Sequence, residues 1–249
     1  MRDTELSIKQ IAYIETDFKE KFGIPRQSGR VPTLQGRIVF LPEYRNSESL
    51  RGIEDFSHLW LIFDFSESHR DEWSPTVRPP RLGGNKRVGV FASRSPFRPN
   101  PLGLSCVRLE RVEKTEDKGH ILIVSGVDLL DGTPIYDIKP YIPHADCRTD
   151  AVGAYADIAS THRLEVEAPE ELLLQIPEDK RGTVIACIED DPRPSYQNDP
   201  ERVYGMEFAG VNIRFTVDGN KAKIVAADKT QKNDLIPLKH ETRGRVDKK

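Results

Sequence analysis

The sequence predicts a mainly β protein, in which a single-sheeted antiparallel or mixed β-barrel is followed by a small α+β domain. Many short segments are rich in Val, Ile, Leu, Phe and Tyr, and each has turn residues nearby. The gaps between them leave little room for crossover helices, which argues against a doubly wound parallel sheet. The character of the chain then changes after residue 155, where helix-like segments precede three further strands.

The barrel elements follow one another at a spacing typical of closed β architectures. We expect short helices at residues 17–21 and 49–53. We expect strands at residues 7–15, 36–41, 58–65, 87–91, 104–112, 120–127 and 135–141.

The C-terminal part begins with two predicted helices, at residues 169–175 and 177–190. The first has Pro and two Glu at its start, as helix N-termini prefer. Strands are expected at 202–208, 212–217 and 222–227, with Asp218, Gly219 and Asn220 forming a hairpin turn. The predicted domains are therefore 1–155 and 156–237. The charged segment 238–249 is expected to be disordered.

Composition narrows the class of protein. The 249 residues carry a net charge of −3, and the three cysteines contain no CxxC pair, which fits a reducing compartment. The start of the chain lacks an apolar signal core, and no apolar run reaches the ~18 residues that span a bilayer. We therefore expect a cytoplasmic protein. The nucleotide-binding GxGxxG and GxxxxGK[ST] motifs and the GxSxG elbow are absent, and the histidines show no metal-ligand spacing.

A basic stretch from Trp73 to Leu109 is the most informative feature of the chain. It contains no Asp or Glu, although the whole chain is acidic. A basic segment in an acidic protein indicates a local anionic partner, and Arg suits phosphates, carboxylates and base edges. Its basic residues are Arg78, Arg81, Lys86, Arg87, Arg94, Arg98 and Arg108.

Proline stiffens the centre of this stretch. Between Arg94 and Pro101 three prolines fix the backbone and restrain their neighbours, so the two arginines of this loop are held in place. The loop either aims them at a ligand or is a rigid connection whose arginines pair with surface carboxylates. Gly83 and Gly84 either let backbone N–H groups approach a ligand or form a plain turn.

An acidic turn follows the basic stretch. Residues 128–141 contain three carboxylates and one lysine. This pairing of a basic loop with an acidic turn suggests a ligand with both anionic and cationic groups, or two ligands side by side.

Several segments together resemble one known family. PRQSG (25–29), FSHLWLIFDF (56–65), RPPRLGGNKRVGVFASRSPFRPNPLGLS (78–105) and DLLDGTPIYDIKPYIP (128–143) occur in the order found in the TsaA-like (TrmO) tRNA methyltransferases. DPRPSY (191–196) resembles the C-terminal domain of the bacterial members. The likeness covers about residues 6–227. Ser66-Glu67 departs from the His-Gln that members often have there, which puts a side-chain contact at that position in doubt.

The resemblance implies a β-barrel that binds S-adenosylmethionine, a homodimer with its active site near the subunit boundary, and N6-methylation of threonylcarbamoyladenosine beside the tRNA anticodon. Residues carried over as cofactor contacts are Arg26, Gln27, Ser66, Glu67, Arg94, Leu104, Asp131, Gly132, Thr133 and Pro134.

Methyl transfer is an in-line displacement that depends mainly on alignment. Asp137, Lys139 and Tyr141 lie just after residues 131–134, which the resemblance assigns to the cofactor, so they are our candidates for orienting or deprotonating N6. Candidates for RNA contact are Arg78, Arg81, Lys86, Arg98, Arg193 and Tyr196.

Two rival functions remain open. The same fold could methylate another RNA or a small molecule, or the chain could be a non-catalytic RNA-binding barrel. The last would not need the acidic turn, and a methyl-transfer assay separates it from both enzymes.

Overall fold

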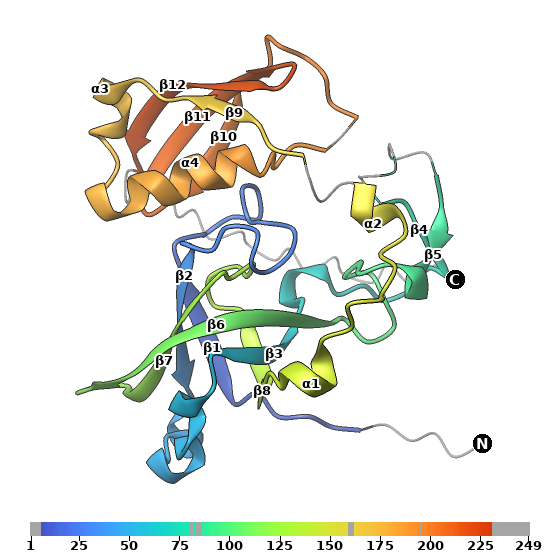
Figure 1. The fold of residues 1–249 in the computed structure, drawn as a ribbon, viewed down its shortest axis with the longest axis vertical. Coiled ribbons are helices and arrows are strands. Elements are labelled where there is room, and N and C mark those ends of the chain that lie inside the picture. Colours follow the sequence, from blue (N-terminus) through green and yellow to red (C-terminus); the bar gives the residue numbers. More distant parts are fainter. Residues whose placement is uncertain (1–5, 80–81, 83–85, 159–161, 195, 231–249) are drawn as a thin grey trace, which may run out of the picture.

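The computed structural model describes residues 6–79, 82, 86–158, 162–194 and 196–230. Figure 1 shows two parts, with the C-terminal sheet above the N-terminal strands in that view. The predicted tail 238–249 lies outside the described residues, as do Arg81, Gly83 and Gly84.

Within the described part, six strands form a closed barrel in the order β1-β2-β7-β6-β3-β8. Every pairing in this ring is antiparallel. The barrel that the sequence predicts is therefore present. The strands are β1 (Ala12–Thr16), β2 (Gln35–Phe40), β3 (His58–Asp64), β6 (Leu102–Thr115), β7 (Gly119–Ser125) and β8 (Pro134–Pro140).

Alternation along β6 separates the barrel interior from its outer face. Gly103, Ser105, Val107 and Leu109 are buried, whereas Leu102 and Leu104 are exposed. Gly103 is required by packing, because a Cβ there would lie 2.1 Å from the ring of Phe63. The interior is thus filled by side chains, and ligand groups must be presented at the ends or on the outer face.

Two expected elements of the N-terminal part are wrong. Residues 87–91 do not form a barrel strand. Instead β5 (Val88–Gly89) pairs with β4 (Thr76–Val77) in a separate two-stranded ribbon. Residues 17–21 are not helical, because their carbonyls have other partners. The oxygen of Asp17 accepts from the Ala209 N–H, and that of Phe18 from the Asp131 N–H.

Short helical turns complete this part. The expected helix at 49–53 is a 3-10 turn, η2 (Ser47–Leu50). The others are η1 (Pro42–Tyr44), η3 (Ile53–Asp55), η4 (Ser66–Ser68), η6 (Val90–Ala92), α1 (Pro143–Asp146) and α2 (Tyr155–Ile158).

The C-terminal sheet has the order β10-β11-β12-β9. The hairpin turn at Gly219 is confirmed, whereas no predicted strand covers β9, which pairs with β12 in parallel. The elements are β9 (Glu165–Glu167), α3 (Glu170–Leu173), η7 (Glu178–Lys180), α4 (Arg181–Glu189), β10 (Tyr204–Phe208), β11 (Val211–Asp218) and β12 (Lys221–Lys229).

The two parts share one apolar core. Phe18, just after β1, packs edge-on against Phe208 of β10 with ring centroids 4.9 Å apart. Lys180 Nζ lies 2.6 Å from a carboxylate oxygen of Asp17. This packing fixes the C-terminal sheet against the segment that links β1 to the loop at residues 25–29.

Within the described residues, no helix is long and apolar enough to cross a membrane. In the same part of the chain, no group of three or more His, Cys, Asp or Glu side chains could hold a metal ion.

Candidate cofactor and RNA site

One end of the barrel gathers the residues of interest. There β1, β3 and β7 end and β2, β6 and β8 begin, and we call it the site end. The loop at residues 25–29 fills the gap where β6 and β7 are not yet paired. Ser28 Oγ accepts from the Cys106 N–H at 3.2 Å, and the Gly29 N–H donates to the Gly126 oxygen at 2.8 Å. One side-chain and one backbone hydrogen bond therefore fix the loop, and Arg26 and Gln27 directly precede the residue bonded to β6.

Arg94 reaches this loop from the proline-rich segment. Its Nη1 donates to Oε1 of Gln27, and its charge acts on the nearby Asp128. Asp128 accepts from Ser105 Oγ at 2.6 Å. Burial raises the pKa of Asp128 from 3.8 to about 6, although the hydrogen bond from Ser105 and the charge of Arg94 lower it. The site end thus holds an exposed cation beside a half-buried carboxyl group.

Arg26 is held from the C-terminal part. Its Nη2 donates to the carbonyl oxygen of Arg193 at 2.5 Å. Burial lowers the pKa of Arg26, while the charges of Asp191 and Asp190 raise it. The position of Arg26 therefore depends on the turn at 190–193.

That turn gives Arg193 a different role from the expected one. Its side chain is only 7% exposed and forms a bidentate ion pair with Asp191, at 2.8 and 3.0 Å. A buried and neutralised guanidinium is not presented to RNA, so we withdraw Arg193 as an RNA contact. Tyr196 remains a candidate, because it is 60% exposed.

The turn at Asp131 lies at the same end but is largely used by the fold. Asp131 Oδ1 accepts from the Thr16 N–H at 2.9 Å, and Lys19 Nζ lies 2.6 Å from Oδ2. The Gly132 N–H donates to the Ile14 oxygen, and the Thr133 hydroxyl donates to the oxygen of Leu130. The turn is therefore hydrogen-bonded to the end of β1, and Pro134 is the first residue of β8.

Ser66 and Glu67 form the turn η4 directly after β3 and are both exposed. Lys21 Nζ donates to the carbonyl oxygen of Glu67 at 3.0 Å and lies 3.4 Å from its carboxylate. This pair therefore borders the site end as the resemblance implies, with its carboxylate already matched to a lysine.

The outer face of β6, β3 and β8 places a cofactor candidate near a catalytic one. Leu104, Ile62 and Asp137 are paired in one row across the three strands. Two strand spacings separate Leu104 from Asp137, about 10 Å. Lys139 lies in the next row, with its Nζ 2.8 Å from a carboxylate oxygen of Asp137. Asp137 and Lys139 therefore face the same side as the exposed Leu104.

Tyr141 lies at the opposite end of the barrel. Its N–H donates to the His58 oxygen at 2.9 Å, and its ring is 5.8 Å from that of Trp60. Four residues of extended chain, about 13 Å, separate it from Asp137. Desolvation and the neighbouring Cys147 raise the pKa of Tyr141, so its hydroxyl keeps its proton. The structure does not bring Tyr141 together with the other catalytic candidates.

The RNA candidates of the basic stretch lie on and beside the β4–β5 ribbon. Arg78 and Lys86 are exposed, and Arg98 is half-buried. Arg87 Nη1 donates to Thr76 Oγ1 at 3.0 Å across the ribbon.

Sequence reasoning missed two groups at this end. Asp128 was seen only as part of an acidic turn, and its burial against Ser105 has no signal in the sequence. Asp64, only 8% exposed, accepts from or shares a proton with His69 Nε2 at 2.7 Å. Asp64 also raises the pKa of Tyr136, although desolvation of that hydroxyl contributes more. The spacing of five residues between Asp64 and His69 does not suggest a helical pair, so the contact follows from the turn η4.

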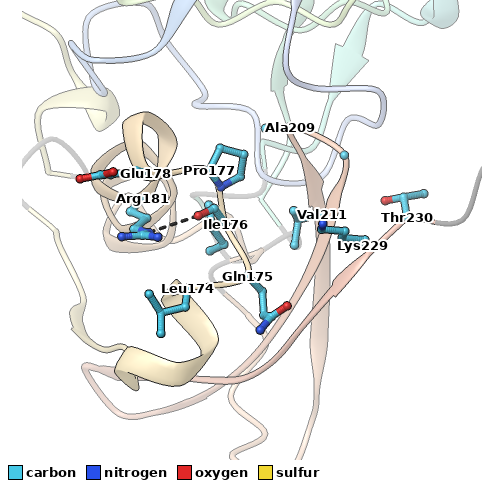
Figure 2. Close-up of a pocket in the computed structure, with 11 residues that line it drawn as sticks. Leu174, Gln175, Ile176, Pro177, Glu178, Arg181, Ala209, Val211, Lys229 and Thr230 are labelled. Atoms are coloured by element: carbon cyan, nitrogen blue, oxygen red, sulfur yellow. Dashed lines mark hydrogen bonds between the residues drawn. The ribbon is translucent and has the colours of Figure 1, made fainter.

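A pocket of about 470 Å³ lies elsewhere, between α3 and the β10–β11 turn (Figure 2). Arg181 points into this region, but its Nε already donates to the carbonyl oxygens of Leu173 and Ile176 at 2.9 and 3.1 Å. None of our site candidates lines the pocket. We therefore do not assign it to the candidate site.

Asp128 makes stability depend on pH in a predictable way. Its folded-state pKa of about 6 exceeds the ordinary 3.8, so the folded protein holds a proton that the unfolded chain releases between these values. The stability that protonated Asp128 contributes to the folded protein is therefore lost as pH rises from about 4 to 6. The shift corresponds to about 3 kcal/mol.

We expect Asp128→Asn to remove this slope, because an amide oxygen can still accept from Ser105 but cannot ionise. Denaturant unfolding of both proteins from pH 4 to 7.5 measures the difference. Parallel stability curves for the two proteins would contradict the assignment of the shift to Asp128.

Comparison with known proteins decides the family. The family model of the tRNA-methyltransferase O N-terminal domain matches residues 13–147, and that of the TrmO C-terminal domain matches residues 161–230. The chain belongs to the tRNA-methyltransferase O family. The predicted domain boundary at residue 155 falls between the two matched regions.

Individual relatives agree with this family. The chain is 40% identical over 222 residues to the tRNA (adenine(37)-N6)-methyltransferase of Escherichia coli (strain K12), covering 86% of this chain and 94% of that protein. It is 40% identical to a Pyrococcus abyssi protein named "Probable S-adenosyl-L-methionine-binding protein", covering 63% of this chain and 79% of that protein. The crystal structure of TrmO from Pseudomonas aeruginosa has a TM-score of 0.73 and 34% identity, covering 90% of this chain and 99% of that one.

Proposed function

We propose that this chain transfers a methyl group from S-adenosylmethionine to the N6 atom of adenine 37 in tRNA, where the adenine carries a threonylcarbamoyl group. The observation that carries the proposal is the meeting of Arg94, Gln27 and the half-buried Asp128 at the site end. The names of the relatives support the methyl donor and the position in tRNA.

The charged side chains at the site end match the charged groups of this cofactor. S-adenosylmethionine supplies an electrophilic methyl group on a sulfonium and also carries an ammonium, a carboxylate and an adenine. Arg94 and Arg26 would hold the carboxylate, and an ionised Asp128 would hold a cationic group. Leu104 offers an exposed apolar surface for the adenine. Backbone groups of the turns at Ser66–Glu67 and Asp131–Pro134 would border the cofactor, since most of their side-chain groups are already bonded.

Asp137 and Lys139 would serve the acceptor. The lone pair of an adenine N6 is delocalised, so a group that orients N6 or removes its proton helps the reaction. Asp137 can accept that proton, and Lys139 can fix the position of the Asp137 carboxylate through their ion pair. Tyr141 could contribute only from a second subunit, because it lies at the other end of its own barrel.

We also propose a homodimer, formed through the outer face of β6 and β3. Leu102 and Leu104 are 37% and 53% exposed there, and Ile62 lies beside Leu104. Sedimentation equilibrium should give twice the monomer mass of 28.3 kDa. Leu102→Arg should shift the mass to that of the monomer, and a monomeric wild type would contradict the proposal.

We also propose a cytoplasmic location, which a tRNA substrate and the free Cys106, Cys147 and Cys187 support, since a reducing compartment keeps thiols free.

Calorimetric titration with S-adenosylmethionine tests the donor, with and without tRNA present. We expect saturable binding, although the chain lacks a Rossmann glycine motif. Binding of RNA without any binding of the cofactor, alone or with tRNA, would instead favour a non-catalytic RNA-binding barrel.

A further inference from the structure

Two aromatic rings stand exposed on the β4–β5 ribbon. Trp73 precedes β4 and is 51% exposed, and Phe91 follows β5 and is 74% exposed. Their ring centroids are 6.3 Å apart, with an angle of 33° between the planes. The rings therefore touch each other while each keeps a large surface open to solvent. Figure 1 shows this ribbon at the edge of the molecule, beside α2.

The surrounding backbone holds both rings in place. The Val90 N–H donates to the Pro75 oxygen at 3.0 Å, which ties the segment before Phe91 to the segment after Trp73. The Tyr155 hydroxyl of α2 donates to the Ala92 oxygen at 3.3 Å. Rings that are held before a ligand arrives lose less entropy when it binds.

The charge around the rings favours an anionic partner. Arg78, Lys86 and Arg87 are exposed on or beside the two ribbon strands, and no carboxylate occurs from Trp73 to Leu109. Asp71 and Glu72, directly before Trp73, are the nearest carboxylates in the sequence. Exposed aromatic rings among Arg and Lys side chains are the arrangement by which proteins stack unpaired bases and contact the adjoining phosphates.

We propose that Trp73 and Phe91 form a stacking platform for an unpaired base of the RNA substrate, with Arg78 and Lys86 contacting the neighbouring phosphates. The proposal rests on the proposed function for the identity of the partner, a tRNA anticodon loop. The platform lies outside the donor site and takes no part in the chemistry.

Binding of a synthetic anticodon stem-loop RNA tests the platform. Loss of one stacked base corresponds to about 5- to 150-fold weaker binding, which we expect for both Trp73→Ala and Phe91→Ala. Trp73→Phe and Phe91→Tyr should bind nearly as wild type does, because they keep a ring. Phe56→Ala is the matched control, since Phe56 is 38% exposed directly after η3, away from the ribbon. Affinity for S-adenosylmethionine should stay constant in all of these variants.

Fluorescence gives a second readout that a purely structural role would not change. The chain has two tryptophans, Trp60 and Trp73. A base stacked on Trp73 should quench emission when the stem-loop binds, and this quench should be absent in Trp73→Phe although the RNA still binds. A blunt RNA duplex without a loop should give little quench.

Wild-type affinity in both alanine variants, or an unchanged quench in Trp73→Phe, would overturn the platform. Methyl transfer separates the two proposals. If wild type methylates tRNA but shows no Trp73-dependent quench, the platform is wrong and the proposed function stands. If the quench is present without methyl transfer, the platform stands and the proposed function is wrong.

Discussion

Arg94→Ala is expected to weaken S-adenosylmethionine binding by about 2–5 kcal/mol, which is about 30-fold to several thousand-fold in Kd. Arg94 is exposed and is held by Gln27 in a proline-rich loop, so little core packing is lost with it. Titration calorimetry measures the loss, and thermal unfolding measures the stability, which should change little.

Arg51→Ala provides the matched control for Arg94. Arg51 is also an exposed arginine with one side-chain partner, Glu48, but it lies after η2 at the end of the barrel opposite the site end. Its variant should bind the cofactor as wild type does. If Arg94→Ala unfolds at a much lower temperature and the folded molecules keep normal activity, the loop is structural.

Asp137→Asn and Lys139→Ala are expected to lower kcat by ~10²–10⁴-fold while leaving cofactor affinity nearly unchanged. Both side chains lie on the outer face of β8, and Asp137 lies about 10 Å from Leu104 of β6, across β3, where the acceptor base would lie. Single-turnover methyl transfer measures the rate, and calorimetry measures cofactor binding separately.

Glu113→Gln is the control for this pair. Glu113 and Arg111 form another exposed ion pair two residues apart on a barrel strand, at 2.8 Å, but far along β6 from the site end. Its variant should turn over normally. A loss of cofactor binding in step with activity would place Asp137 and Lys139 in the donor pocket, and normal turnover in both would leave alignment alone as the cause of catalysis.

The barrel could be predicted from the sequence because alternating segments between turn residues leave few other arrangements. The prediction failed at residues 17–21 and 87–91 for a shared reason. The local sequence of each segment suits a regular helix or strand. In the fold, however, the backbone groups of each segment bond to residues outside it. The carbonyls of Asp17 and Phe18 bond Ala209 and Asp131, and Val88 pairs with Val77 in a separate ribbon.

The site residues that share one loop could be predicted from the sequence. The contacts between residues that are distant in the sequence could not. The proline-rich loop pointed to Arg94, but nothing in the sequence indicated that its neighbour would be Gln27 or that Asp128 would be half-buried beside it. The motif DPRPSY suggested RNA contact. In the fold Arg193 is buried against Asp191, and its carbonyl holds Arg26. The sequence shows one Asp and one Arg in this motif, but it does not show that the two side chains pair with each other.

The central claim is tested most directly by the nucleoside that receives the methyl group. Purified protein would be incubated with S-adenosylmethionine and with tRNA that has or lacks the threonylcarbamoyl group, and the digested nucleosides would be analysed by mass spectrometry. We expect one new nucleoside, N6-methylated threonylcarbamoyladenosine, from position 37 of the modified tRNA only. A methyl group on any other nucleoside, or no methyl transfer to either tRNA, would contradict the account.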